Sequence, residues 1–226
     1  MERTSVKKHV AIIEKYMMSE TGLRHLLSSP ATQKYRFHFF RNSQIFIEAM
    51  NNTDFFSVIY SLSGLREPRR EFLMCLNILS VSPPGSQRIV LADDDREARL
   101  VSRLYPKELH GILTKSDTLS ALLSQLVTLL GETRRVNDNV INHWYVRRSR
   151  MLSPTEHEIL GYMTRGMSIP EIAHMLDRNI KTVRAHKFNS MAELGINSEV
   201  ALLHAADIIT CVPMSTFVQN TDSAVA

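Results

Sequence analysis

The last third of this sequence contains two closely spaced helix-start signals, which constrain its fold more than any other feature. Ser153-Pro154-Thr155-Glu156 and Ser168-Ile169-Pro170-Glu171 each combine a capping serine, a proline in the first turn and a glutamate at the third helical position. This combination satisfies backbone N–H groups that a helix start leaves without partners. Asn179 is a good cap for a third helix. We therefore predict helices at residues 154–165, 169–176 and 180–193. The short turn between the last two is typical of a helix-turn-helix.

The third predicted helix has a polar and basic side that suits DNA. Its apolar positions, among them Ile180, Val183 and Leu194, fall together at 3.6 residues per turn and must face the core, as must Ser190 and Met191. The residues that we expect to contact DNA are Lys181, Thr182, Arg184, Ala185, His186, Lys187, Phe188 and Asn189. With Arg178 this stretch is basic and contains no acid, although the formal net charge of the chain is only +4. Such a cluster attracts a phosphate backbone, and a solvated helix face is the alternative on charge alone.

These side chains have different expected partners on the duplex. The forked guanidinium of Arg184 suits guanine O6 and N7 or a phosphate, and Ala185 is small enough to let base edges approach. Phe188 would contact a thymine methyl, or alternatively cover an interface between domains. Phosphates are the expected partners of Lys181, Thr182, His186 and Asn189. For His186, the role of a satisfied polar neighbour stays open. Lys187 points toward the core side, where its stem packs while its ammonium reaches a phosphate.

A fourth helix is predicted after Gly195, a typical C-cap, and Ser198, the next N-cap. One of its faces consists of small and apolar residues, namely Ala201, Leu202, Ala205, Ala206 and Ile209. A face of this kind lets two helices approach closely. It therefore suits a dimer contact or the core of the domain, and the sequence leaves both alternatives open.

The first 130 residues alternate between short apolar runs and segments with helical periodicity. We predict strands at 9–13, 35–39, 55–60, 88–92 and 111–113, and helices at 19–27, 43–50, 69–79, 95–104 and 118–130. This alternation indicates an α/β doubly wound domain of the flavodoxin type with a parallel sheet. The predicted organisation is this domain at 1–130, a linker at 131–150 whose Trp144 packs onto a domain, an all-α four-helix domain at 151–212 and a disordered tail at 213–226.

Composition and motif spacing argue against several classes of protein. Cys75 and Cys211 lie too far apart to indicate a disulfide framework or a zinc site, so Cys75 is expected in the core. We find no signal peptide and no apolar run near the roughly 20 residues that span a bilayer, and expect a cytoplasmic protein without membrane contacts. The sequence also shows no nucleophile–base pair and no metal cluster, so we predict neither an enzyme nor a cofactor.

The helix-turn-helix stretch resembles the LuxR/FixJ-type family of bacterial transcription regulators. The segments LSPTEHEIL, GMSIPEIA, KTVRAH and LGINS carry this resemblance, which runs from Leu152 to Ile209. In that family the segment from about Ile169 to Phe188 reads DNA. The resemblance therefore implies DNA contacts for Lys181, Thr182, Arg184, Ala185 and His186.

The first half resembles a response-regulator receiver without its phosphorylation chemistry. Such a receiver needs an acidic pair for Mg²⁺ after the first strand, an acceptor aspartate after the third, a hydroxyl after the fourth and a lysine after the fifth. This chain has Glu14-Lys15, Ser61 and Ala92 at the first three places, and only Lys115 fits. One carboxylate supplies too few oxygen ligands for Mg²⁺, and serine cannot form an acyl phosphate. We therefore predict a pseudo-receiver, with the run Asp93–Asp95 capping the next helix.

The resemblance to RcsB-like members of the family also implies protein partners. It implies a phosphorylation-independent activator that pairs with the response regulator RcsB as a heterodimer at silenced operons, such as those for aryl-β-glucoside use, and acts on RNA polymerase. The pairing surface expected by analogy is at residues 92–113. Two alternatives remain: a regulator whose first domain senses an acyl-homoserine lactone, and a protein that sequesters its partner without binding DNA.

Overall fold

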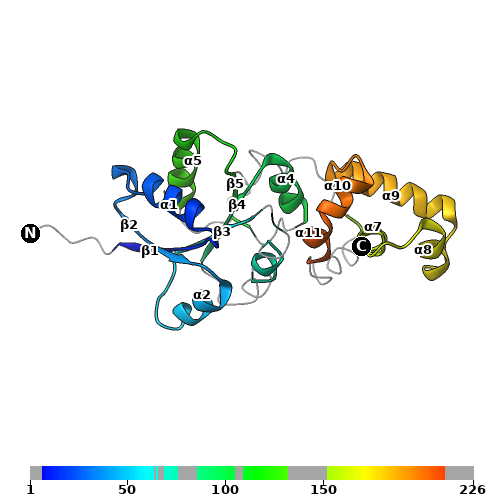
Figure 1. Cartoon of the computed structure of the whole chain (residues 1–226), viewed down its shortest axis with the longest axis horizontal. Helices are drawn as coiled ribbons and strands as arrows, with labels where there is room; N and C mark the ends of the chain where they lie inside the picture. The colour runs from blue at the N-terminus through cyan, green and yellow to red at the C-terminus, as the bar shows by residue number, and fades with distance from the viewer. Residues whose placement is uncertain are drawn as a thin grey trace, which may run out of the picture. The chain divides into compact units, whose positions relative to one another are not determined.

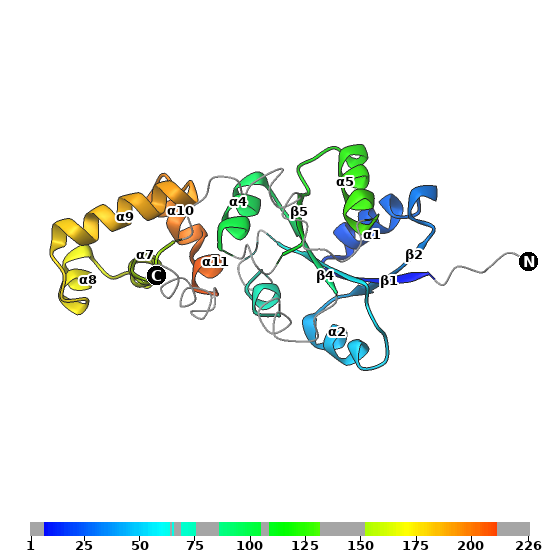
Figure 2. The same cartoon turned by 180° about the vertical axis from the view of Figure 1, so that it is seen from behind.

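The chain divides into two compact units, which are described separately below. Met1–Ala98 with Lys107–Trp144 forms one, and Arg99–Pro106 with Tyr145–Ala226 forms the other. The computed structural model describes residues 7–63, 65, 69–75, 86–104, 109–131 and 152–211 (Figures 1 and 2). The domain boundaries expected from the sequence stay predictions. Trp144, the other linker residues at 132–150 and the predicted tail lie outside the described residues.

The first unit is built on a five-stranded sheet whose neighbouring strands all run parallel, in the order β2-β1-β3-β4-β5. The strands are β1 (Lys8–Ile13), β2 (Tyr35–Phe40), β3 (Ser57–Ser61), β4 (Gln87–Ala92) and β5 (Gly111–Thr114). The helices are α1 (Met17–Leu26), α2 (Ser43–Met50) and α5 (Leu119–Gly131), with a short turn of 3-10 helix at Pro30–Thr32. Helix α4 (Asp95–Leu104) begins in this unit, and its residues from Arg99 onward are grouped with the second. Residues 69–75 form a further helix between β3 and β4. A helix thus follows each strand, which confirms the predicted doubly wound class.

Helices cover both faces of this sheet, and its strands are therefore strongly apolar. Leucines of α1 and α5, such as Leu23 and Leu126, pack with Ile12 and Ile89 of the strands in one cluster. On the other face, Phe46 of α2 lies against Phe40 and Phe55, with ring centroids 5.5 and 5.6 Å away. Figure 1 shows α1 and α5 on one side of the sheet and α2 on the other.

The second unit is helical, and its helices begin at the predicted caps. They are α7 (Pro154–Thr164), α8 (Ile169–Met175), α9 (Ile180–Leu194), α10 (Glu199–His204) and α11 (Ala206–Thr210). Both capping boxes are complete, and the side chain of Asn179 accepts a hydrogen bond from the N–H of Lys181 at 2.8 Å. In the turn between α8 and α9, Asp177 has a φ of 49°, and the N–H of Arg178 donates to the carbonyl of Ala173 at 2.9 Å. This left-handed turn lets α9 start immediately after α8.

The small-residue face of the predicted fourth helix lies in the core of the second unit. Leu202, Ala205, Ala206 and Ile209 are each at most 5% exposed. The core alternative is therefore confirmed for these four side chains, while Ala201 is half-buried and a dimer contact there stays a prediction. The helix is also not continuous, because it is divided at Ala205 into α10 and α11. Among the described residues, no helix combines the length and apolar character that crossing a membrane requires.

Two glycines give opposite predictions for stability. A Cβ added at Gly111 would lie 2.7 Å from Cδ1 of Leu129, so Gly111→Ala should lower the stability of the first unit by about 1–3 kcal/mol. At Gly161 of α7, among the described residues, the added Cβ would meet no atom within 4 Å, so Gly161→Ala should stabilise the second unit by about 0.5–1 kcal/mol. Calorimetric unfolding of both variants checks this. A gain for Gly111→Ala or a loss for Gly161→Ala would contradict the packing described here.

Candidate nucleic-acid interface

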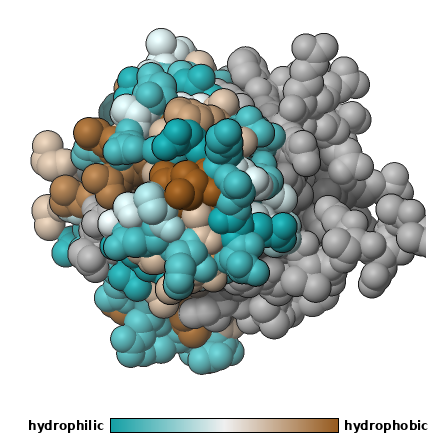
Figure 3. Space-filling view, turned by 90° about the vertical axis from the view of Figure 1, so that its right-hand side faces the viewer, coloured by the Kyte–Doolittle hydropathy of each residue, from teal (hydrophilic) through white to brown (hydrophobic). Residues whose placement is uncertain are grey.

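The outward side of α9 exposes most of the residues predicted to contact DNA. These are Lys181, Thr182, Arg184, Ala185, Phe188 and Asn189. Phe188 is 61% exposed, an unusual position for a large aromatic side chain. The inward side contains Val183, which is fully buried against Ile159 and Ile172. Ile180, predicted on the core side, is 43% exposed at the first position of the helix. Figure 3 shows that this end of the second unit is largely hydrophilic, with small apolar areas.

Lys187 is bound within the protein. Its side chain is 12% exposed, and its Nζ donates to Oε1 of Glu199 at 2.6 Å. This hydrogen bond and the charge of the ammonium lower the pKa of the exposed Glu199 carboxyl. The stem packs on the core side as predicted, but the ammonium has a carboxylate partner. Lys187 therefore links α9 to the start of α10, and Glu199 is a residue that the sequence analysis missed.

His186 lies at the edge between the exposed and buried sides of α9. Its Nδ1 is 3.7 Å from Oε1 of Glu156, whose side chain is 5% exposed. The other carboxylate oxygen of Glu156 accepts hydrogen bonds from the backbone N–H of Ser153 at 2.9 Å and from its Oγ at 2.7 Å. The capping glutamate of α7 thus also faces the candidate DNA-reading helix. The sequence analysis assigned Glu156 only its capping role.

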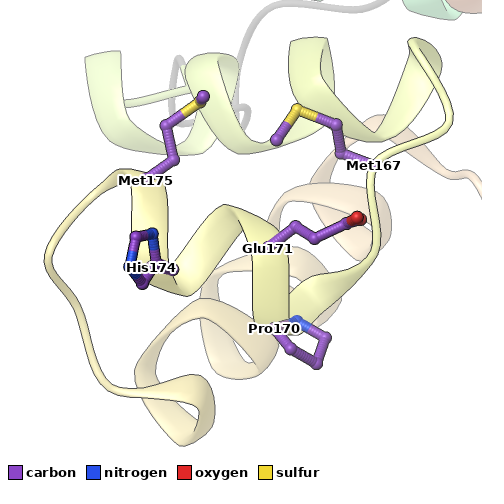
Figure 4. Close-up of a pocket in the computed structure, with 5 residues that line it drawn as sticks. All are labelled: Met167, Pro170, Glu171, His174 and Met175. Atoms are coloured by element: carbon purple, nitrogen blue, oxygen red, sulfur yellow. The ribbon is translucent and has the colours of Figure 1, made fainter.

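A pocket lies on the surface of α8, lined by Met167, Pro170, Glu171, His174 and Met175 (Figure 4). Its lining is mostly apolar, and Met175 is 57% exposed. The carboxylate of Glu171 accepts hydrogen bonds from Ser168 Oγ and N–H, both at 2.7 Å, which lower the pKa of Glu171. This carboxylate serves the helix cap, so the pocket offers chiefly apolar contacts.

In the first unit, the residues predicted at the receiver site meet at the carboxyl edge of the sheet. Glu14 follows β1 and is 1% exposed. Its Oε2 accepts hydrogen bonds from the hydroxyls of Ser61, at the end of β3, and Ser19, at 2.6 Å. Its Oε1 accepts from the N–H of Tyr16 at 2.9 Å. Both carboxylate oxygens of Glu14 are therefore occupied by donors from α1, its preceding loop and β3.

Lys115, which follows β5, completes this network. Its Nζ donates to Oδ1 of Asp93 at 2.8 Å and to the carbonyl of Leu62, and lies 3.7 Å from Oε2 of Glu14. Ala92 is buried at the end of β4 and supplies no polar side-chain atom. Lys15 is exposed. The network therefore includes Glu14, Ser61 and Lys115, but neither of the other two residues predicted there.

The run Asp93–Asp95 has two roles. Oδ1 of Asp94 accepts from the N–H groups of Arg96 and Glu97 at 2.9 and 2.8 Å, so the predicted capping of α4 is confirmed for this residue. The Asp93 carboxylate instead binds Lys115. Capping was therefore the wrong role for Asp93, because its partner lies on the neighbouring strand's loop.

These side chains do not fit a receiver's Mg²⁺. The position between the Glu14 and Asp93 carboxylates is taken by the ammonium of Lys115, and a hard cation needs more free oxygen ligands than remain. In the part of the chain that the structure describes, no group of three or more His, Cys, Asp or Glu side chains is arranged to hold a metal ion. Lys115 itself supplies the positive charge that balances the two carboxylates.

Comparison with known proteins bears on both units. Residues 150–206 match the family model described as bacterial regulatory proteins, luxR family. Over 213 residues the chain is 46% identical to the transcriptional activator protein BglJ of Escherichia coli K12, covering 94% of this chain and 95% of BglJ. The chain belongs to the LuxR family of bacterial regulatory proteins.

Two comparisons with RcsB cover most of this chain. RcsB of Escherichia coli K12 is 24% identical over 180 residues, 77% of this chain and 82% of RcsB. The structure of RcsB from Salmonella enterica serovar Typhimurium bound to promoter rprA matches with a TM-score of 0.66 at 23% identity, covering 89% of this chain and 100% of that one. The likeness confirms the receiver-like fold followed by a helix-turn-helix domain. It favours the receiver prediction over the lactone-sensor alternative, and the relatives are regulators rather than enzymes.

Replacing Lys115 tests the balance of charges in the first unit. Lys115→Met leaves the buried Glu14 without its neighbouring cation and should destabilise the unit by about 2–4 kcal/mol. The matched control is Lys15→Met, which removes an exposed ammonium and should leave the stability unchanged. Thermal unfolding of both variants measures the difference. A Lys115→Met chain with native stability would refute this account.

Proposed function

We propose that this LuxR-family chain is a sequence-specific transcriptional activator that reads the major groove of DNA with α9. One observation carries the proposal: α9 buries Val183 on one side and exposes Arg184, Ala185 and Phe188 on the other. The guanidinium of Arg184 can donate two hydrogen bonds to one base. The small Ala185 allows the bases to approach closely, and the ring of Phe188 offers an apolar contact. These are the means by which base edges and thymine methyls are recognised in the major groove.

The remaining exposed residues suit the phosphate backbone. Lys181, Thr182 and Asn189 flank the base-reading side and would orient the helix without specifying sequence. Lys187 acts differently from the other basic residues, because its ammonium is held by Glu199. We assign it to the link between α9 and α10, so that its removal would affect DNA binding through the position of α9.

We also propose that the first unit works without phosphorylation. Ser61 stands where an acceptor aspartate would be, and its hydroxyl is engaged by the buried Glu14. The lysine that would hold phosphoryl oxygens is bound by Asp93 and the Leu62 carbonyl. The Ser61 hydroxyl and the Lys115 ammonium thus both have partners inside the unit. Activity would then follow the abundance of the chain and of its partners.

The partner that we propose is an RcsB-like response regulator, in a heterodimer that acts in the cytoplasm on RNA polymerase at silenced operons, including those for aryl-β-glucoside use. The proposal rests on 46% identity with BglJ over almost the whole chain and on the shared RcsB fold. The pairing surface is proposed at residues 92–113. The alternative of a sequestering protein is weakened by the exposed, basic α9, which such a protein would not need.

Arg184→Ala should weaken the preference for the promoter sequence. Losing one forked contact to a base costs about 1–3 kcal/mol, which is about a 5- to 150-fold loss of affinity for the promoter duplex. A random-sequence duplex should be affected much less. The matched control is Arg165→Ala, which removes the same charge from an exposed position outside α9. Fluorescence anisotropy at fixed salt measures all four affinities. Equal losses for the two variants would show that Arg184 contributes charge alone, and unchanged binding would remove α9 from the interface.

The pair with an RcsB-like regulator should form without phosphorylation of this chain. Size-exclusion chromatography of the mixed proteins should give a heterodimer peak that is the same whether or not this chain has been treated with acetyl phosphate and Mg²⁺. Intact mass of the treated chain should show no added phosphoryl group. Failure to co-elute would count against the partner, and a stable phosphoryl adduct would refute the pseudo-receiver.

A further inference from the structure

The contact between His186 and Glu156 joins the candidate DNA-reading helix to a buried carboxylate. Glu156 is 4% exposed, and its Oε2 is used by the α7 cap. Its Oε1 lies 3.7 Å from Nδ1 of His186, whose side chain is 37% exposed. A buried carboxylate stabilises a nearby positive charge more than an exposed one does, because water screens it less. The Oε1 of Glu156 is thus placed beside the ring of His186.

Other charged groups near His186 are already engaged. Lys187, next to it on α9, is bonded to Glu199 of α10. On α7, the ring of His157 is directed elsewhere, with Nε2 2.9 Å from the carbonyl of Ile209 in α11. From the elements described around this position, Glu156 is thus the acidic group that faces the imidazole.

We propose that Glu156 is a positioning residue for DNA binding, which holds protonated His186 so that its imidazole bridges the buried carboxylate and a DNA phosphate. This inference rests on the proposed function of α9. The protonated ring has two N–H donors, and one directed at Glu156 leaves the other for a phosphate oxygen. Neutral imidazole has one donor and no charge, so it cannot serve both partners. DNA affinity should therefore rise as pH falls through the range in which histidine ordinarily gains its proton.

The test is the pH dependence of binding to a random-sequence duplex, because a phosphate contact needs no particular sequence. Fluorescence anisotropy with the full chain at constant ionic strength should show about three- to tenfold tighter binding at about pH 6 than at about pH 8, the net effect of one hydrogen bond at an exposed surface. His186→Gln and Glu156→Gln should each remove most of this difference. Glutamine at position 156 still completes a capping box, so the helix start is retained.

His204→Gln is the matched control, because His204 is an exposed histidine on α10 in the same unit, outside the segment assigned to DNA. This variant should keep the pH dependence of the native chain. The inference is overturned if His186→Gln keeps the native dependence, if Glu156→Gln keeps it, or if His204→Gln removes it. Binding that is equal at both pH values in the native chain would also overturn it while leaving the proposed function intact. Absence of binding at every pH would refute the proposed function itself.

Discussion

The arrangement of the second unit depends on the packing of Val183 against Ile159 and Ile172. Burying this one side of α9 fixes the rotation of the helix about its axis, and so determines which side chains face solvent. Two polar contacts act at the margins of the same helix: Lys187 binds Glu199, and His186 faces Glu156. The exposed strip between these margins contains the residues assigned to DNA. Apolar packing thus determines which residues of α9 are exposed. The contacts of Lys187 and His186 restrict the rotation of α9 about its axis.

The first unit meets a different constraint, which is the cost of burying a carboxylate. Glu14 is almost fully buried, and an ionised group in such a place must be paired and hydrogen-bonded. Two hydroxyls, one backbone N–H and the Lys115 ammonium provide this compensation. A receiver leaves comparable groups open to a metal ion and a phosphoryl group. Here the side chains at the same edge of the sheet bind one another, so the loops after β1, β4 and β5 are linked by hydrogen bonds and ion pairs.

Local rules predicted most of the fold and the surface of α9. The capping boxes, Asn179 and Asp94 were correct because a cap depends on residues within one turn of the chain. The β3 strand was placed early, at 55–60 instead of Ser57–Ser61, because the ring of Phe55 packs against α2 before the strand begins. An apolar run alone does not distinguish these positions. Residues 76–79 of the helix predicted at 69–79 lie outside the described part of the chain.

The contacts that the sequence did not reveal all join separate elements. Lys115 and Asp93 follow different strands, and Glu156 meets His186 across two helices. No periodicity or motif spacing encodes such a pairing, because it depends on how the elements pack.

The sequence could not decide whether the small-residue face of α10 and α11 belongs to the core or to a dimer contact, because this also depends on how the elements pack. Small side chains permit close approach to any helix, whether in the same chain or in another. Only the packing of the whole unit shows that Leu202 and Ile209 are covered from within, while Val200 and Leu203 remain outside.

On the proposed function, the regulation of this protein comes from its amount and its partners rather than from its own phosphorylation. In the first unit the Ser61 hydroxyl and the Lys115 ammonium are both held by carboxylates, and in the second the side of α9 that we assign to DNA is exposed. A protein whose DNA-reading helix needs no rearrangement can be controlled by its amount, by a partner or by conditions that change its charge. Of the ionisable side chains on α9, His186 is the one whose charge ordinarily changes near neutral pH, and a buried carboxylate faces it. On the proposed function, a proton on His186 would therefore adjust DNA affinity in a receiver-like fold that works without a phosphoryl group.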